Sequence, residues 1–290
     1  MAFRTIVIKN RCKLEYSLNY LVCRGEDEKK ILLDEIEFLI IQNTGVAITC
    51  ALLSALIEKK VKVIFCDGKS NPQAELTPYY NNYSTYKKIQ QQINFQEKSK
   101  LEIWSSIIRQ KILHQSLVLK ECDLTSSYEK LVEYLNQIEL GDVTNREGHA
   151  AKVYFNALFG NKFSRDDDQN VINKYLNYGY SIIVSCINRE IKMLGYLTEI
   201  GVHHIGETNA FNLSYDFFEP LRPFIDIQVI KNRVNEDNYK DYFIRLLQAK
   251  VFIKGNAMFL DNAIHIYIQS LFSALIKNNP DEIQYIDYEL

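Results

Sequence analysis

Two kinds of sequence pattern divide the chain near residue 80. Up to about residue 76 the apolar residues fall in short, often β-branched runs, as at 5–8, 36–41 and 61–66, which is typical of β-strands. From about residue 85 they recur at three- and four-residue intervals in long stretches without proline, which is typical of amphipathic helices. Because strands and helices are segregated rather than alternating, the sequence predicts an α+β fold and not an alternating parallel sheet.

This division also predicts the domains. We expect a β-rich N-terminal domain over 1–76, a linker over 77–84 and an all-α C-terminal domain over 85–290. Further strands are expected at 14–18 and 31–33, one inserted helix at 49–60 and a turn at 67–72, where Gly, Ser, Asn and Pro gather. The helices expected in the second domain lie around 101–112 and at 128–138, 144–158, 170–200, 213–230, 238–249 and 261–276.

The charge balance and the cysteines exclude several classes of protein. With 34 Lys and Arg against 36 Asp and Glu, the net charge of -2 excludes a protein that coats nucleic acid by bulk electrostatics. The six cysteines contain no Cys-x-x-Cys pair, which argues against structural zinc and favours reduced thiols in the cytoplasm. The uncharged stretch at 38–57 is interrupted by a polar turn at 42–45, so we expect no membrane span.

Glu147 is the first candidate for chemistry. Thr144 and Glu147 fit a capping box, in which Glu147 would only cap its own helix. Against that alternative, Glu147 shares one helical face with Ala150 and Tyr154, which points its carboxylate inward. A carboxylate there needs a partner, and a metal ion is one. His149 falls on another face and is expected to be exposed.

A pair of histidines forms the second candidate. His203 and His204 follow the predicted helix at 170–200, which Gly201 is expected to end. A single histidine is more often a structural hydrogen-bonding group than a ligand. Functional residues nevertheless concentrate in loops on rigid scaffolds.

The third candidate is an acidic pair. Asp216 and Glu219 lie three residues apart on one face of a predicted helix, beside two phenylalanines. Carboxylates in such surroundings are costly unless paired. Arg222 could form a salt bridge with either of them, or a divalent cation could bind both.

Two carboxylates and an imidazole suit Mg²⁺ or Mn²⁺ better than structural zinc. Such a cation can polarise a phosphoryl oxygen and activate a hydroxyl, which is the chemistry of phosphodiester cleavage or strand transfer. Basic residues surround Glu147 between 143 and 165 and suggest a path for DNA, although a solvated helix face would explain them too. These candidate DNA-binding residues are Arg146, Lys152, Lys162 and Arg165.

Several segments, in joint order and spacing, are similar to one known family. They are 36–41, 46–49 and 61–67 in the first domain and 104–115, 146–151, 173–180, 216–223 and 288–290 in the second. The chain resembles the CRISPR-associated endonucleases that integrate new spacers, and within them the type II-A-like branch. Over nearly its whole length the resemblance implies a metal-dependent integrase and endonuclease.

The resemblance implies that Glu147, His204 and Glu219 are catalytic and bind the metal, Mg²⁺ or Mn²⁺. Asp216 would assist them, and Arg222, like Arg165, would be a phosphate or carboxylate partner. His204 is preferred over its neighbour because residues 209–212 then fall in register with the branch. The Gly-Leu-Asp-Pro run of many relatives is absent here, so His203 stays open as an alternative.

The resemblance also implies partners. These are a homodimer formed through the β domain, a dimer of a small ferredoxin-like adaptation subunit, and double-stranded prespacer and leader–repeat DNA. The 3′-hydroxyl of each prespacer end would attack a phosphodiester of the repeat. Two alternatives differ in class: a non-catalytic scaffold that binds DNA ends, and a general metal-dependent nuclease that leaves hydrolysed ends.

Overall fold

The computed structural model describes residues 4–78, 84–231 and 233–288. The chain divides into two compact units, Met1–Asn81 and Asn82–Leu290. Most of the predicted linker, at 79–83, and the end of the 288–290 segment lie outside the described residues. Along the described ranges, no helix has the length and apolar character needed to cross a membrane.

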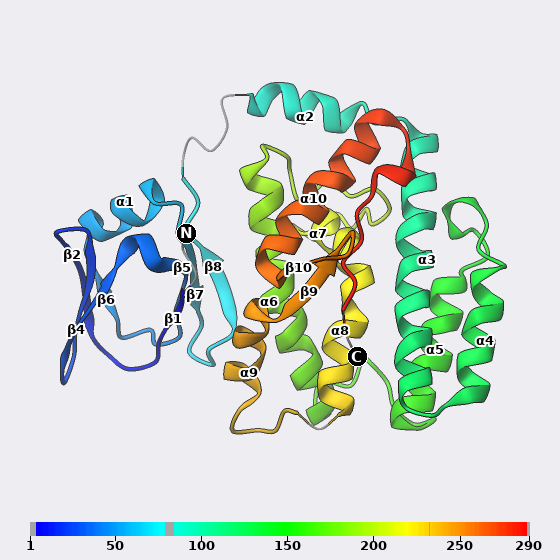
Figure 1. The fold of residues 1–290 in the computed structure, drawn as a ribbon, viewed down its shortest axis with the longest axis horizontal. Helices are drawn as coiled ribbons and strands as arrows, with labels where there is room; N and C mark the ends of the chain where they lie inside the picture. The colour runs from blue at the N-terminus through cyan, green and yellow to red at the C-terminus, as the bar shows by residue number, and fades with distance from the viewer. Residues whose placement is uncertain (1–3, 79–83, 232, 289–290) are drawn as a thin grey trace. The chain divides into compact units, whose positions relative to one another are not determined.

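Two four-stranded sheets form the first unit (Figure 1). One has the order β1-β5-β7-β8, in which β1, β5 and β7 are parallel and β8 is antiparallel to β7. The other has the order β4-β3-β2-β6, with β4, β3 and β2 antiparallel and β6 parallel to β2. The strands are β1 Arg4–Ile8, β2 Lys13–Ser17, β3 Tyr20–Arg24, β4 Glu28–Leu32, β5 Ile36–Ile41, β6 Ala47–Ile48, β7 Lys62–Cys66 and β8 Pro72–Glu75.

The inserted helix predicted at 49–60 is α1, Cys50–Glu58, and Thr49 caps it by accepting a hydrogen bond from the Leu52 amide. Leu52 and Leu56 are fully buried and pack in one apolar cluster with Leu14 and Leu39 from the two sheets. Burial of this helix face therefore joins both sheets into one core.

Three short strands of this unit, β3, β6 and β8, were not predicted. The polar turn predicted at 67–72 is present, because the Asp67 carboxylate accepts hydrogen bonds from the amides of Lys69 and Asn71 at 2.8 Å each. The chain then returns as β8 along β7. The strand predicted at 31–33 coincides with the end of β4 at 31–32, and the 3₁₀ turn Leu33–Glu35 begins directly after it.

The second unit is mainly helical and is organised around α3, which packs against α4, α5, α8 and α10 (Figure 1). Trp104, Ile108 and Ile112 lie on its buried face. The α-helices are α2 Thr85–Ile93, α3 Glu97–Glu121, α4 Thr125–Leu135, α5 Arg146–Phe159, α6 Val171–Met193, α7 Asn212–Phe218, α8 Arg222–Ile230, α9 Tyr239–Arg245 and α10 Leu260–Lys277. Short 3₁₀ turns lie at Leu140–Asp142, Glu219–Leu221, Leu246–Gln248 and Pro280–Glu282.

The prediction of an all-α second domain is wrong. The second unit also contains an antiparallel hairpin of β9, Lys250–Ile253, and β10, Asn256–Phe259. Its two-residue turn places Lys254 and Gly255 at φ of 49° and 75°, the left-handed geometry that suits a tight hairpin. The polar composition of this turn and the shortness of the strands gave little periodic signal.

One predicted helix ends early and another is interrupted. The helix expected at 170–200 stops at Met193, because Gly195, with φ of 86°, takes the left-handed conformation that ends helices. Gly201 is therefore not its terminator. The helix expected at 213–230 is split by the 3₁₀ turn Glu219–Leu221, since Pro220 has no amide hydrogen to donate. Glu219 keeps helical backbone angles, φ of -48° and ψ of -45°, at the start of this turn.

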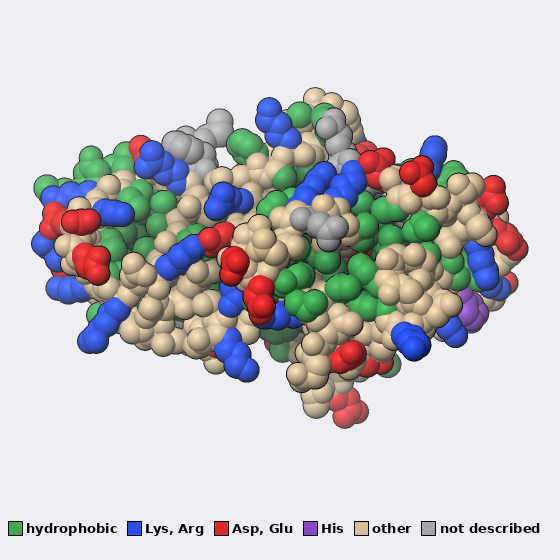
Figure 2. All heavy atoms as spheres, turned by 90° about the horizontal axis from the view of Figure 1, so that it is seen from below, with side chains coloured by type: hydrophobic (Ala, Val, Ile, Leu, Met, Phe, Trp, Pro, Cys, Tyr) green, Lys and Arg blue, Asp and Glu red, His purple; other side chains and the backbone are tan. Residues whose placement is uncertain are grey.

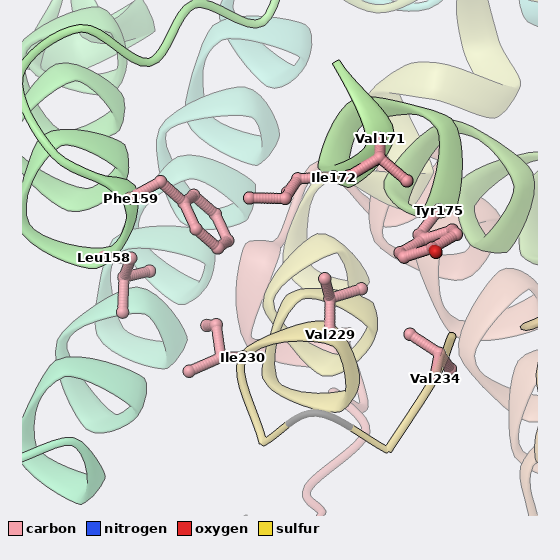
Figure 3. Close-up of a pocket in the computed structure, with 8 residues that line it drawn as sticks. All are labelled: Leu158, Phe159, Val171, Ile172, Tyr175, Val229, Ile230 and Val234. Atoms are coloured by element: carbon pink, nitrogen blue, oxygen red, sulfur yellow. The ribbon is translucent and has the colours of Figure 1, made fainter. Parts of the chain in front are cut away.

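An apolar pocket of about 350 Å³ lies at the C-terminal end of α5 (Figure 3). Phe159 of α5, Ile172 and Tyr175 of α6 and Val229 of α8 are among its lining residues. Glu147 lies at the opposite end of α5. The pocket therefore belongs to the packing of helix ends and contains none of the predicted site residues.

Candidate active site

A lysine of α3 brings two predicted site residues together. The Lys111 ammonium nitrogen lies 2.6 Å from Oε1 of Glu147, in the first turn of α5, and 2.5 Å from Oε2 of Glu219, in the turn between α7 and α8. Two carboxylates that are far apart in sequence thus converge on one positive charge.

This cluster is largely excluded from water. The Lys111 and Glu219 side chains are 6% and 3% exposed, and that of Glu147 is 26% exposed. Arg222 also donates from Nε to Oε2 of Glu219, at 2.8 Å. Burial opposes ionisation of Glu219, but Arg222 and Lys111 outweigh it and hold its pKa at about 2. Burial likewise opposes the charge of Lys111, yet Glu219 and Glu147 raise its pKa overall.

The two alternatives for these carboxylates have different outcomes. The predicted salt bridge is present between Glu219 and Arg222. The capping-box alternative for Glu147 is wrong, because Asn145 is the N-cap of α5 and accepts from the Gly148 amide. The Asp142 carboxylate accepts a hydrogen bond from the backbone amide of Glu147, at 2.9 Å. The Glu147 side chain does not cap the helix and contacts Lys111 instead.

Asp216, on α7, organises the histidine loop. Its fully buried carboxylate accepts hydrogen bonds from the amides of Val202, His203 and His204 at 2.7, 3.0 and 3.2 Å. It also contacts Nδ1 of His204 at 2.5 Å. A Cβ on Gly201 would lie 2.3 Å from the His204 carbonyl oxygen, so the loop can pack this closely only around glycine.

The two neighbouring histidines have different surroundings. The hydrogen bond that His204 donates to Asp216 raises the pKa of His204 against the effect of burial, and the Glu219 and Glu147 carboxylates raise it further. His204 therefore lies in the field of both acids. His203 is exposed and stacks on Trp104, with ring centroids 4.0 Å apart and an angle of 3°. His149 is exposed, as predicted.

The donor set of Glu147, Glu219 and His204 fits a divalent cation in its chemistry. The acids offer oxygen ligands, and because Nδ1 of His204 is held by a carboxylate, Nε2 is the nitrogen that could bind a metal. Within the described ranges no three Asp, Glu, His or Cys side chains are already arranged to hold a metal ion. The positive charge between the two acids is that of Lys111.

The predicted DNA-binding residues differ in their surroundings. Lys152 and Lys162 are exposed, whereas the Arg146 guanidinium lies over the Tyr134 ring at 5.4 Å. Arg165 donates to the amide oxygens of Asn173 and Asn177 on α6, and three exposed aspartates follow it at 166–168. On the face drawn in Figure 2, Lys and Arg side chains are interspersed with Asp and Glu.

Lys111 is the site residue that sequence reasoning missed. Lys111 lies on one face of α3 with Trp104, Ile108 and Gln115, since three or four residues separate each from the next, and all of them are buried. A lysine on such a stripe requires a buried anionic partner, and this was the available signal.

Asp226, on α8, is a second buried ionisable residue that sequence reasoning missed. It is fully buried and accepts a hydrogen bond from the Tyr180 hydroxyl at 2.5 Å. Burial raises its pKa to about 6, although the hydroxyls of Tyr180 and Tyr154 and the nearby arginines act in the opposite direction. Its other carboxylate oxygen and the Tyr154 hydroxyl are both buried and have no hydrogen-bond partner among the described residues.

We expect Asp226→Asn to stabilise the protein at pH 8. The folded pKa of about 6 exceeds the reference value of 3.8, so the stability given by the neutral acid is complete below pH 3.8 and lost as the pH rises through about 6, at a cost on the order of 3 kcal/mol. An asparagine stays neutral and can donate to Tyr154. Chemical denaturation from pH 5 to pH 8 should show a gain that grows with pH; an equal loss at both pH values would contradict this account.

Comparisons with known proteins identify the family of the chain. Residues 5–258 match a protein-family model described as CRISPR associated protein Cas1. A CRISPR-associated endonuclease Cas1 from Neisseria meningitidis serogroup C (strain 8013) is 32% identical over 292 residues, covering 98% of this chain and 96% of the relative.

Two solved structures are similar in fold. A casposase bound to integration product superposes with a TM-score of 0.74 at 18% identity, covering 96% of this chain and 92% of the casposase chain. A partial Cas6-RT-Cas1–Cas2 complex gives a TM-score of 0.68 at 18% identity, covering 99% of each chain. These similarities confirm the predicted α+β fold.

Proposed function

The chain belongs to the CRISPR-associated Cas1 family, and from this premise we propose that it is a metal-dependent DNA endonuclease and integrase that inserts prespacer DNA into a CRISPR repeat array. The observation that carries the proposal is the convergence of Glu147 and Glu219 on one buried positive charge, beside His204. The name of the Neisseria relative, an endonuclease, supports the same activity.

In this proposal the Glu147 and Glu219 carboxylates and Nε2 of His204 hold Mg²⁺ or Mn²⁺. When bound there, such a cation would supply polarisation of a phosphoryl oxygen and neutralisation of the charge that develops in the transition state. Asp216 fixes the His204 ring through Nδ1, which keeps Nε2 directed to the ligand position. Arg222 holds Glu219 in its ionised form, so this ligand is available across the physiological pH range.

The reaction is a transesterification. The 3′-hydroxyl of a prespacer end attacks a phosphodiester at the leader–repeat boundary or at the far end of the repeat. A bond forms between phosphorus and the prespacer oxygen, and the bond from phosphorus to the 3′ oxygen of the target strand breaks. The hydroxyl proton of the prespacer passes to solvent, and the leaving 3′ oxygen takes up a proton from solvent to become a hydroxyl. The number of phosphodiesters is unchanged, so the step needs no external energy source.

The proposal extends to partners. We place the chain in the type II-A-like branch, as a cytoplasmic homodimer formed through the β-rich unit. Such dimers bind a dimer of a small ferredoxin-like adaptation subunit and double-stranded DNA. The similar Cas1–Cas2 complex supports an assembly of this kind.

We expect Lys152→Ala and Lys162→Ala each to weaken DNA binding and to reduce the slope of log affinity against log salt by about 1. Both side chains are exposed and can contact phosphate directly. Fluorescence anisotropy at salt concentrations from about 50 to about 300 mM, on either side of the physiological concentration, would measure this slope. Lys98→Ala, an exposed lysine that pairs with Glu102 on α3, is the control, and equal slopes for all three variants would contradict the assignment.

One observation favours a non-catalytic scaffold as the second candidate. Lys111 already pairs with both carboxylates, and Arg222 supplies a second positive charge beside Glu219, so these residues have a structural role without any metal. A scaffold predicts DNA binding that is insensitive to chelator and no joined product, whereas the integrase predicts joining that chelator abolishes. A nuclease without integration activity would leave only hydrolysed ends.

A further inference from the structure

We propose that Lys111 is a positioning residue that occupies the cation position between Glu147 and Glu219 in the metal-free protein and leaves it when the cation binds. This inference rests on the proposed function, because it assumes that the two carboxylates bind a divalent cation. It adds a residue of α3 to a site that otherwise comes from α5 and the segment around α7.

The first step is the position of the ammonium group. Its nitrogen lies 2.6 Å from Glu147 and 2.5 Å from Glu219, so it fills the space toward which both acids point. The neighbouring α3 residues Ile107 and Ile112 are fully buried and apolar. The charge of Lys111 is therefore stabilised by the two acids rather than by water.

The second step is the charge balance of the pocket. Glu219 keeps a second cation, Arg222, whose guanidinium is fixed over the rings of Tyr180 and Phe218 at 5.0 and 5.1 Å. Without metal, two carboxylates face two cations. A divalent cation between the acids would repel Lys111 at close range in a pocket with little water. Since the Arg222 guanidinium also rests against the rings of Tyr180 and Phe218, Lys111 is the group that moves.

The third step is the benefit and the cost of this arrangement. Lys111 holds two like-charged carboxylates around one positive charge before any metal arrives, which is preorganisation. It also competes with the metal, so the apparent affinity is reduced by the fraction of molecules in which the lysine has moved away. Glu147, the more exposed acid, lies on the side from which the ion would enter.

The test uses Lys111→Met and Lys111→Gln in the full chain. We expect both variants to melt at a lower temperature without metal, because the two carboxylates lose a shared partner. We expect the dissociation constant for Mn²⁺, measured by titration calorimetry at pH 8, to fall by about tenfold or more as the internal competitor is removed. The rise in melting temperature on adding Mn²⁺ should also exceed that of the wild type.

Ile268→Val, at a fully buried position of α10, is the matched control for lost stability. It should lower the melting temperature and leave the dissociation constant for Mn²⁺ unchanged. If Lys111→Met and Lys111→Gln bind Mn²⁺ with wild-type or weaker affinity, the inference is overturned, because the lysine then does not compete with the metal.

Failure of the proposed function would look different. If the wild type binds no Mn²⁺, or if Glu147→Gln and Glu219→Gln bind it as the wild type does, the metal site itself is wrong and the inference fails with it. If neither Lys111 variant folds, wild-type crystals grown with and without Mn²⁺ decide. An anomalous peak between the two acids with the Lys111 nitrogen moved away supports displacement, and a lysine still bridging both acids overturns it.

Discussion

Glu219→Gln is expected to lower the rate of joining a prespacer 3′ end to a leader–repeat duplex by roughly 10³-fold, the scale of losing a group that stabilises transition-state charge. Glutamine keeps the shape of the side chain and removes its negative charge. The proposed cation would then lose a ligand, and Arg222 and Lys111 would lose the partner that they share. A denaturing gel with labelled prespacer and Mn²⁺ measures the joined product, and Glu147→Gln should behave in the same way.

Glu121→Gln is the matched control for this substitution. Glu121 pairs with Lys231 at 2.7 Å near the C-terminal end of α3, where both side chains are partly exposed. Removing its charge should leave joining at the wild-type rate. If folded Glu219→Gln protein, which still binds DNA, joined ends as fast as the Glu121→Gln control, Glu219 would have no part in the chemistry.

Asp216→Asn is expected to reduce joining by about 10- to 100-fold, the range found for residues that orient metal ligands. Asp216 accepts three amide hydrogen bonds and holds His204 through Nδ1. An asparagine side chain has only one acceptor oxygen. Its NH₂ group would face backbone amides that now donate hydrogen bonds to the second carboxylate oxygen of Asp216. The loop and the His204 ring would both lose their orientation.

The pH profile separates this role from a merely structural one. Asp216 raises the pKa of His204, so in the wild type the imidazole stays protonated, and unable to bind metal, up to a higher pH than an ordinary histidine. Joining should therefore decline on the acid side at a pH above the ordinary histidine value. In Asp216→Asn the decline should move to lower pH, while His203→Ala should leave it in place. An unchanged profile in Asp216→Asn would contradict the orienting role.

The fold could be predicted as far as local patterns determine it. The β-branched runs at 36–41 and 61–66 became the central strands β5 and β7, and the periodic stretches became helices. The missed elements are those whose structure depends on particular contacts or backbone angles. The β9-β10 hairpin rests on left-handed Lys254 and Gly255, and the end of α6 depends on the conformation of Gly195, which periodicity does not encode.

The site was predictable where one helix turn contains the relevant residues. The inward face of Glu147 and the pairing of Glu219 with Arg222 follow from spacing along a helix. The role of Lys111 does not, because its partners lie 36 and 108 residues away. Nor does the cap of α5, since Asp142 precedes that helix in a separate 3₁₀ turn and uses its side chain where Thr144 was expected to act.

The most direct measurement of the central claim compares two prespacers in one joining assay, one ending in a 3′-hydroxyl and one in a 3′-deoxy terminus. With Mn²⁺ and the wild-type protein, we predict that the hydroxyl-ended strand becomes covalently attached to the leader–repeat duplex, and that the deoxy-ended strand does not. Chelator should abolish the joined product. Joining that survives chelator, or hydrolysed ends without any joined strand, would contradict a metal-dependent integrase built on Glu147, His204 and Glu219.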